Sequence, residues 1–177
     1  MAILHPFTAL RPPPELAAEV AAPPYDVIDS REARALAAGK PRSFLHVSRP
    51  EIDLPEGTDE HEAAVYARGA ANLRRAIAEG SLIRDPEPRL YVYAQVMGSH
   101  RQCGIVACAA VAEYDADAIK KHEKTRQDKE DDRTRHIDEL GAHDEPVFLT
   151  YRARPRIDAL VTEIQAAAPA VDLVTDD

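Results

Sequence analysis

The spacing of apolar and polar residues along the chain indicates helices and strands in alternation. Apolar side chains recur at helical spacing through residues 59–80, which predicts a long amphipathic helix. Alternating apolar and polar residues at 43–49 predict a strand that ends before a proline. Two apolar-rich stretches, 89–97 and 102–114, flank a short turn with a glycine. They predict a β-hairpin whose second strand is central and covered on both faces.

Shorter segments surround these elements. The pattern predicts helices at 15–21, after Asp29 or Ser30, and at 153–169, and extended segments at 3–11, 146–151 and 171–174. This order predicts an α+β (mixed α/β) fold, with a small mixed sheet, a β-hairpin at 89–114 and flanking helices. Because the chain ends directly after an extended segment, we expect residues 1–177 to be a single, incomplete domain, the N-terminal part of a longer protein.

A run of charged residues at 120–136 is the most unusual stretch, since it contains no aliphatic or aromatic residue and neither glycine nor proline. We predict that it forms a helix, or a helix together with a loop, and that the helix ends at Gly141. At about 100° per residue, one narrow face of that helix carries four basic side chains, His122, Arg126, Lys129 and Arg133. The pattern alone fits either a solvated helix with internal ion pairs or a cationic face that binds an anion.

Carboxylates accompany this basic face. Glu123 lies on one flank of the predicted helix and Asp132 on the other, with Asp131 next to Asp132 in sequence. A further carboxylate, Asp26, follows a rigid pair of prolines and a tyrosine. Asp26 either belongs to a functional site or stabilises a turn by accepting hydrogen bonds from backbone N–H groups.

Composition narrows the classes of function. The formal net charge of -9 opposes a broad nucleic-acid surface, and the low aromatic content, 5% without tryptophan, opposes a platform that stacks single-stranded bases. No apolar run reaches the ~20 residues of a membrane span. The N-terminus has no basic segment followed by an apolar one, so we expect a cytoplasmic protein. Cys103 and Cys108 fit two buried thiols in a reducing compartment.

Six phrases of the sequence resemble one known family: PFTALRP, APPYDVI, SFLHVSRPEIDLP, LYVYAQV, IKKHEKTRQDKEDDRTRH and EPVFLTY. Together they cover most of the chain and are similar to the bacterial domain-of-unknown-function family 1015. Members of that family are typically longer and have a downstream motif of the Asp-Gly-His-His-Arg type, which this sequence lacks. That motif resembles the phosphate-binding box of ParB/sulfiredoxin-fold proteins.

The ParB/sulfiredoxin group includes nucleotide-dependent kinases that act on free serine. The resemblance therefore implies a phosphotransferase for a small polar substrate, using ATP or ADP with Mg²⁺. On this interpretation Asp26 and Glu123 are the predicted catalytic carboxylates. The predicted phosphate ligands are His122, Arg126, Lys129 and Arg133, and the predicted metal ligands are Asp131 and Asp132.

The same resemblance leaves a second interpretation open, a non-catalytic ParB-like module that binds nucleic acid or a protein partner. Binding to nucleic acid would weaken steeply with salt, and the acidic net charge disfavours it. The sequence predicts neither the identity of a substrate nor the oligomeric state.

Overall fold

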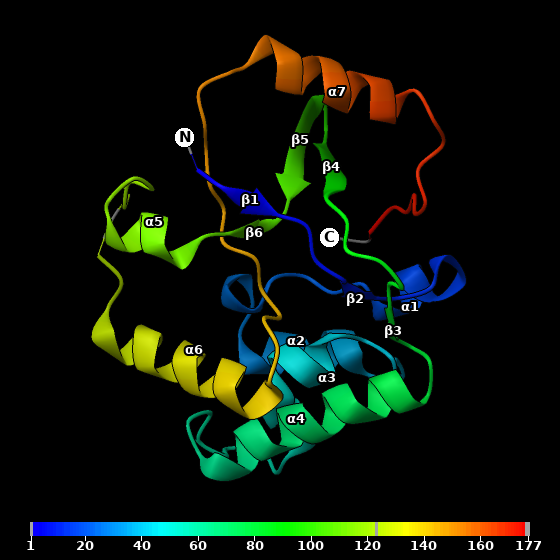
Figure 1. Cartoon of the computed structure of the whole chain (residues 1–177). Helices are drawn as coiled ribbons and strands as arrows, with labels where there is room; N and C mark the ends of the chain where they lie inside the picture. Colours follow the sequence, from blue (N-terminus) through cyan, green and yellow to red (C-terminus); the bar gives the residue numbers. More distant parts are fainter. Residues whose placement is uncertain (1, 123, 176–177) are drawn as a thin grey trace. The chain divides into compact units, whose positions relative to one another are not determined.

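The computed structural model describes residues 2–122 and 124–175 and contains two compact units (Figure 1). We call residues 1–10, 84–124 and 146–170 the hairpin unit, and residues 11–83, 125–145 and 171–177 the helical unit. Each unit is assembled from segments that are far apart in the sequence. Within the described residues, no helix is long and apolar enough to span a bilayer.

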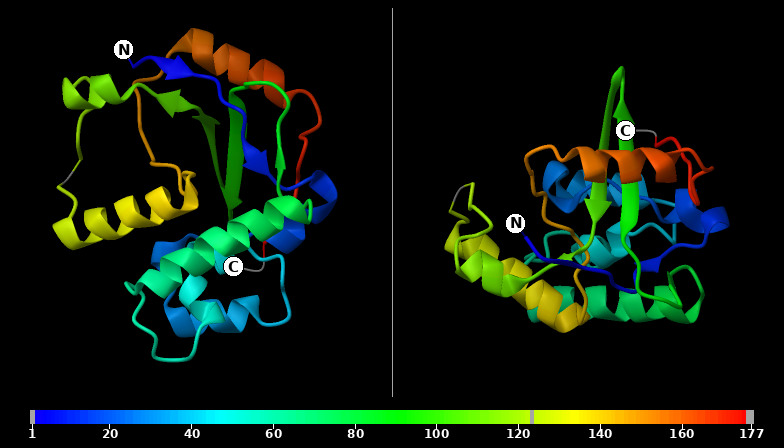
Figure 2. Two further views of the ribbon diagram at one scale, coloured as in Figure 1. Left: turned by 60° about the horizontal axis from the view of Figure 1, so that its bottom comes forward. Right: turned by 45° about the horizontal axis from the view of Figure 1, so that its top comes forward.

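The helical unit consists of short helices around one long helix. Its elements are η1 (Pro14–Leu16), α1 (Ala17–Val20), η2 (Tyr25–Val27), α2 (Ser30–Ala37), α3 (Leu45–Ser48), η3 (Pro50–Asp53), α4 (Ala63–Ala78) and α6 (Gln127–Leu140). The long helix α4 packs against α3, η3 and α6, and Figure 2 shows α4 and α6 side by side. Gly69 permits this close packing, because a Cβ there would lie 3.2 Å from Pro50 Cγ. The helix predicted at 59–80 is confirmed, with a start at Ala63.

Two clusters of buried apolar side chains hold the helical unit together. One cluster contains Val20, Val47, Leu73 and Leu82. The other contains Ala33, Ala37, Leu45 and Ile52. Helix α3 contributes to both clusters, through Val47 and Leu45, and therefore connects them. Burial of apolar surface is the main favourable term in folding, so the stability of this unit rests on these clusters.

Local sequence signals set the ends of two helices. Asp29 caps α2 with a capping box. Its carboxylate accepts a hydrogen bond from the backbone N–H of Glu32 at 2.8 Å, and the Glu32 carboxylate accepts one from the backbone N–H of Asp29 at 2.9 Å. Gly141 has a φ of 65° and ends α6 in the left-handed region that favours glycine. Both predicted helix ends, at Asp29 and at Gly141, are confirmed.

The charged run does not form one continuous helix, so the helix predicted over 120–136 is wrong and the alternative, a helix together with a loop, is confirmed. Helix α6 begins at Gln127, Arg126 is its N-cap, and residues 120–122 lie outside any helix. Helices in proteins are stabilised chiefly by burying one face against the rest of the fold. The first part of the run offers no apolar side chain for that purpose. Helix α6, in contrast, buries His136 and half-buries Ile137 near its C-terminal end.

The hairpin unit contains β1 (Leu4–His5), β4 (Tyr91–Met97), β5 (His100–Val106), β6 (Cys108–Ala109), α5 (Val111–Asp115) and α7 (Pro155–Gln165). Strands β2 (Leu10–Arg11) and β3 (Ile83–Arg84) lie where the chain passes from one unit to the other. Strands β4 and β5 pair antiparallel, from Tyr91 opposite Val106 to Met97 opposite His100. The predicted hairpin is therefore confirmed. Helices and small antiparallel sheets together confirm the α+β class.

Several predicted strands take another form. Residues 43–49 contain helix α3 instead of a strand, and both Leu45 and Val47 are buried in it. The prediction was wrong because seven residues are too few to distinguish the apolar period of a helix from that of a strand. Residues 146–151 and 171–174 have no regular structure. These segments have the composition of strands, but no neighbouring strand pairs with them among the residues that the structure describes.

The prediction that the second hairpin strand is covered on both faces is also wrong. Strand β5 ends at Val106, and most of its residues are exposed. Cys103 and Cys108 are exposed free thiols rather than buried ones. A run of apolar residues predicted burial here, but burial requires a partner surface that the sequence pattern does not specify.

Replacement of Leu45 by alanine should lower the free energy of unfolding by about 2–5 kcal/mol, because the Leu45 side chain is 1% exposed and its removal leaves a cavity. Leu36, which is 42% exposed on the neighbouring helix α2, is the matched control. Leu36→Ala should cost less than about 1 kcal/mol. Urea unfolding followed by circular dichroism measures both values, and equal losses would contradict the proposed core.

Candidate anion-binding site

A pocket in the helical unit brings several charged side chains together. Its polar and aromatic lining consists of Tyr25, Ser48, Arg49, Glu51, Glu60, Tyr66, Lys129, Asp132, Arg133 and His136. The pocket has a volume of about 30 Å³. A buried water needs roughly 10–15 Å³ of such space. The pocket therefore has room for about two water molecules and cannot enclose a whole nucleotide.

Arg133 is the central cation of this pocket. Its guanidinium lies over the Tyr25 ring, 4.2 Å from the ring centroid. Nε and Nη2 donate hydrogen bonds to one oxygen of Asp132, at 3.0 and 2.9 Å. Burial opposes the charged guanidinium, but the Asp132 carboxylate outweighs burial and raises the pKa of Arg133. The remaining nitrogen, Nη1, is buried without a hydrogen-bond partner among the described residues.

Arg49 is the second guanidinium of the pocket. Its Nη2 donates a hydrogen bond to the carbonyl of Ile28 at 3.2 Å, and its Nη1 donates one to Glu60 at 3.3 Å. Nε lies 3.1 Å from a Glu51 oxygen, in an ion pair whose side chains are only 13% and 7% exposed. This Nε is nevertheless buried without a well-directed hydrogen bond to any described residue. Each of the two arginines thus has one buried nitrogen without a hydrogen bond to a described residue, and both residues line this pocket.

Asp132 fixes the position of Arg133 and joins α6 to α4. One of its oxygens accepts a hydrogen bond from the Tyr66 hydroxyl at 2.6 Å and lies 3.1 Å from His61 Nδ1. Burial and the hydrogen bond to Asp132 raise the pKa of Tyr66 to about 12. Burial favours neutral Asp132, but the contacts with Tyr66 and Arg133 prevail and lower the pKa of Asp132. Asp132 is therefore held as a carboxylate with both oxygens engaged.

The structure brings together two of the four predicted phosphate ligands. Lys129 and Arg133 both line the pocket, one turn apart on α6. Within the described ranges, no ion pair joins Lys129 to another residue. Arg126 does not line this pocket; its side chain is 76% exposed and contacts Asp128 at 2.6 Å. His122 is exposed and belongs to the hairpin unit, so the predicted four-residue helix face does not form.

The predicted carboxylates occupy different environments. Asp26 is an exposed residue of η2, next to Tyr25. Asp131 is exposed and accepts a hydrogen bond from Gln127 at 2.7 Å, whereas Asp132 lines the pocket. Glu123 lies outside the described residues. The catalytic and metal-binding roles stay predictions, and no group of three or more His, Cys, Asp and Glu side chains in the described part of the chain is arranged to hold a metal ion.

The loop after α6 brings two acidic residues, Asp144 and Glu145, into the helical unit. His136 Nε2 lies 2.9 Å from Asp144, and these side chains are 2% and 5% exposed. The backbone N–H of Tyr25 favours the ionised form of Glu145. Burial, together with the negative charge of Asp144, raises the pKa of Glu145 to about 7. A carboxyl group that titrates near neutral pH therefore lies close to Arg133.

The sequence pattern does not single out Arg49 or Tyr66 as site residues, whereas His136 extends the predicted basic face of the charged run. Tyr66 falls inside an amphipathic helix, where an aromatic residue indicates core packing. Arg49 precedes a proline in what the pattern predicts as a loop. One feature of the sequence is consistent with a buried Arg49: an acidic residue, Glu51, follows two positions later and pairs with it. A buried arginine usually requires a carboxylate nearby.

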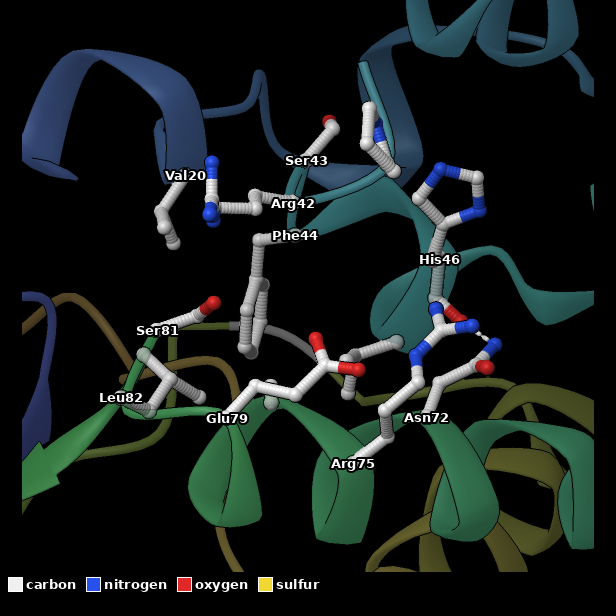
Figure 3. A pocket seen from close by; sticks show the side chains of 13 residues that line it. Val20, Arg42, Ser43, Phe44, His46, Asn72, Arg75, Glu79, Ser81 and Leu82 are labelled. Carbon is white, nitrogen blue, oxygen red and sulfur yellow. Dashed lines mark hydrogen bonds between the residues drawn. The ribbon is translucent and has the colours of Figure 1, made fainter. Parts of the chain in front are cut away.

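The side chains around a second pocket of the helical unit form hydrogen bonds with one another (Figure 3). His46 Nδ1 lies 2.7 Å from Asp53, and Asn72 donates hydrogen bonds to the same carboxylate at 2.7 Å and to the His46 carbonyl at 2.6 Å. The hydrogen bond to Asp53 raises the pKa of His46. The volume of this pocket, about 10 Å³, holds roughly one water molecule. We therefore place the candidate site in the larger pocket.

Tyr66→Phe should lower the free energy of unfolding by about 1–3 kcal/mol, because it leaves a buried Asp132 oxygen without its hydroxyl donor. Tyr93→Phe removes the same hydroxyl from a side chain that is 58% exposed, and should change stability by less than about 0.5 kcal/mol. Chemical denaturation of the two variants tests this difference. A Tyr66→Phe protein as stable as the wild type would contradict the anchoring role of Asp132.

The chain was compared with protein families, curated proteins and solved structures. The family model described as "Protein of unknown function (DUF1015)" matches residues 4–177. No curated protein and no solved structure matches the chain. The match covers nearly the whole sequence and agrees with the resemblance carried by the six sequence phrases. The chain therefore belongs to the DUF1015 family.

Proposed function

We propose that the pocket of the helical unit binds the phosphoryl group of a small ligand. We propose further that this site serves a nucleotide-dependent phosphotransferase that acts on a small polar substrate such as free serine. The arrangement of cations in the pocket supports the first statement. The second statement rests on the ParB/sulfiredoxin-like motif of longer members of the family, which this chain lacks, and is the more specific of the two.

The observation that carries the proposal is the pair of unsatisfied guanidinium nitrogens. Arg49 Nε and Arg133 Nη1 belong to side chains that line one pocket, and both nitrogens are buried without a hydrogen-bond partner among the described residues. Nearly all buried polar atoms in folded proteins have a partner, and each exception costs about 1–3 kcal/mol. A tetrahedral anion offers oxygens in several directions and would satisfy both donors. Lys129 supplies a third positive charge at the same place.

The residues of the pocket have distinct roles in this proposal. Phosphoryl transfer depends on positioning and charge neutralisation more than on covalent chemistry with the protein. Arg133 and Arg49 hold phosphate oxygens, and Lys129 neutralises further charge. Asp26, exposed beside Tyr25, orients the hydroxyl of the acceptor substrate. ATP would supply the phosphoryl group, and the small volume of the pocket leaves the nucleoside outside it.

The proposed reaction does not use a metal ion held by Asp131 and Asp132. Asp132 already accepts hydrogen bonds from Tyr66 and Arg133, and Asp131 contacts Gln127 instead of the pocket. The two carboxylates therefore do not converge on one point where a magnesium ion would bind both. No step of the proposed reaction is assigned to a metal ion on these residues.

Calorimetric titration of the 177-residue chain with pyrophosphate, ADP and ATP tests the proposal, with and without Mg²⁺. We expect saturable binding that weakens at least about tenfold in Lys129→Gln and Arg133→Gln, because each loses a charge-assisted contact worth roughly 1.5–3 kcal/mol. Lys129→Gln is the cleaner variant, since Lys129 is exposed and removing it disturbs no ion pair with a described residue.

Arg126→Gln is the matched control, because it removes a cation of the same helix end that does not line the pocket. Its affinity for pyrophosphate should stay within about twofold of the wild type. Loss of binding in Arg126→Gln with retention in Lys129→Gln would move the anion site to the N-terminus of α6. Saturable binding without phosphoryl transfer by the longer family members would favour a non-catalytic module instead of a kinase.

A further inference from the structure

His46 of α3 has an oxygen atom at hydrogen-bond distance from each of its ring nitrogens. Nδ1 lies 2.7 Å from a carboxylate oxygen of Asp53 in η3, and Nε2 lies 3.2 Å from the backbone carbonyl oxygen of Lys40. A carbonyl oxygen only accepts hydrogen bonds, and so does an ionised carboxylate. A neutral imidazole has one N–H and would turn a lone pair toward one of these two oxygens. The imidazolium form has two N–H groups and satisfies both oxygens.

The contacts of Asp53 favour its ionised form. The second oxygen of its carboxylate accepts a hydrogen bond from the side chain of Asn72 at 2.7 Å. Burial favours neutral Asp53, but the hydrogen bonds with His46 and Asn72 prevail and lower the pKa of Asp53. The pair therefore consists of a carboxylate and an imidazolium, whose side chains are only 21% and 16% exposed. Solvent and salt screen such a pair less than they screen a surface ion pair.

The His46–Asp53 ion pair closes the chain segment 46–53. This segment contains most of α3 and all of η3, and it carries Arg49, which lines the candidate anion-binding pocket. Asn72 of α4 donates hydrogen bonds to both ends of the segment, to the His46 carbonyl at 2.6 Å and to the Asp53 carboxylate. The position of Arg49 therefore depends on contacts at the two ends of its segment.

Other charged side chains surround this ion pair. From α4 and from the rim of the adjoining pocket they are Arg68, Arg75, Arg42 and Glu79. Arg75 lines the same pocket as His46 and opposes its protonation (Figure 3). The hydrogen bond to Asp53 raises the pKa of His46 against the opposing effects of burial and Arg75. The net effect of the surroundings agrees with the imidazolium that the two hydrogen bonds require.

We propose that protonated His46 and Asp53 form a pH-sensitive clamp, which holds the segment 46–53 in place and loosens when His46 loses its proton. Deprotonation turns a lone pair toward one of the two oxygens. One hydrogen bond is then lost, and the other is no longer strengthened by the positive charge. This inference concerns the fold around Arg49 and stands whether or not the neighbouring pocket binds an anion.

The direction of the pH effect follows from linkage. The pKa of His46 is raised in the folded state, so its contribution to stability is complete below the ordinary value of 6.5 and is lost as the pH rises through the folded pKa. The pKa of Asp53 is lowered, so its contribution is present above the ordinary value of 3.8 and is lost as the pH falls through the folded pKa. The clamp is therefore strongest between about pH 4 and pH 6.5.

Long-range proton–nitrogen NMR spectra of the wild-type chain report which ring nitrogens of His46 carry a proton. We expect both nitrogens to be protonated at pH ~6, and the pKa of His46 to lie above 6.5. Asp53→Asn removes the negative charge with little change of shape and should lower that pKa. A wild-type pKa of 6.5 or below would overturn the proposal, and so would an unchanged pKa in Asp53→Asn.

Urea unfolding at several pH values measures the consequence for stability. The unfolding equilibrium constant of His46→Gln, divided by that of the wild type, should fall about fivefold between roughly pH 6 and a pH above the pKa that NMR gives. This fall is expected because a hydrogen bond from a charged donor contributes more than one from a neutral donor. The matched control is His143→Gln, at an exposed histidine of the same unit, whose ratio to the wild type should stay constant. A constant ratio for His46→Gln would contradict the clamp.

Discussion

The candidate site of this protein depends on the contacts that the Asp132 carboxylate makes. It accepts a hydrogen bond from Tyr66 of α4 and holds the guanidinium of Arg133 on its own helix. Helix α6 has few apolar side chains to bury, and this charge-assisted contact replaces part of the missing apolar packing against α4. Arg133, once held by Asp132, lies over the Tyr25 ring and brings η2 into the same site. One carboxylate thus connects three elements.

This arrangement has an energetic consequence for the pocket. Arg133 and Arg49 are held in place by carboxylates, yet each leaves one buried nitrogen without a hydrogen bond to a described residue. Leaving such donors unpaired destabilises a fold, so a structure that keeps two of them in one pocket retains a cost that a bound anion would remove. Three cations and three carboxylates line the pocket, so it is locally neutral in a chain whose formal net charge is -9.

The sequence predicted the elements whose stability is local. The capping box at Asp29, the glycine stop at Gly141 and the hairpin all appear where the pattern placed them. The pattern was wrong where tertiary packing decides, as for residues 43–49, which form a short buried helix. For the site, helical spacing correctly put Lys129 and Arg133 on one face. It could not include Arg49, because the approach of η3 to α4 depends on packing that no local pattern describes.

A crystal structure of the chain with bound tungstate, an anomalously scattering analogue of phosphate, tests the anion site. We expect one strong anomalous peak within hydrogen-bond distance of Arg133 Nη1 and Arg49 Nε, with Lys129 turned toward it. A peak at the N-terminus of α6, beside Arg126, would contradict the assignment of the pocket. A well-ordered pocket with no peak at saturating tungstate would contradict the anion site altogether.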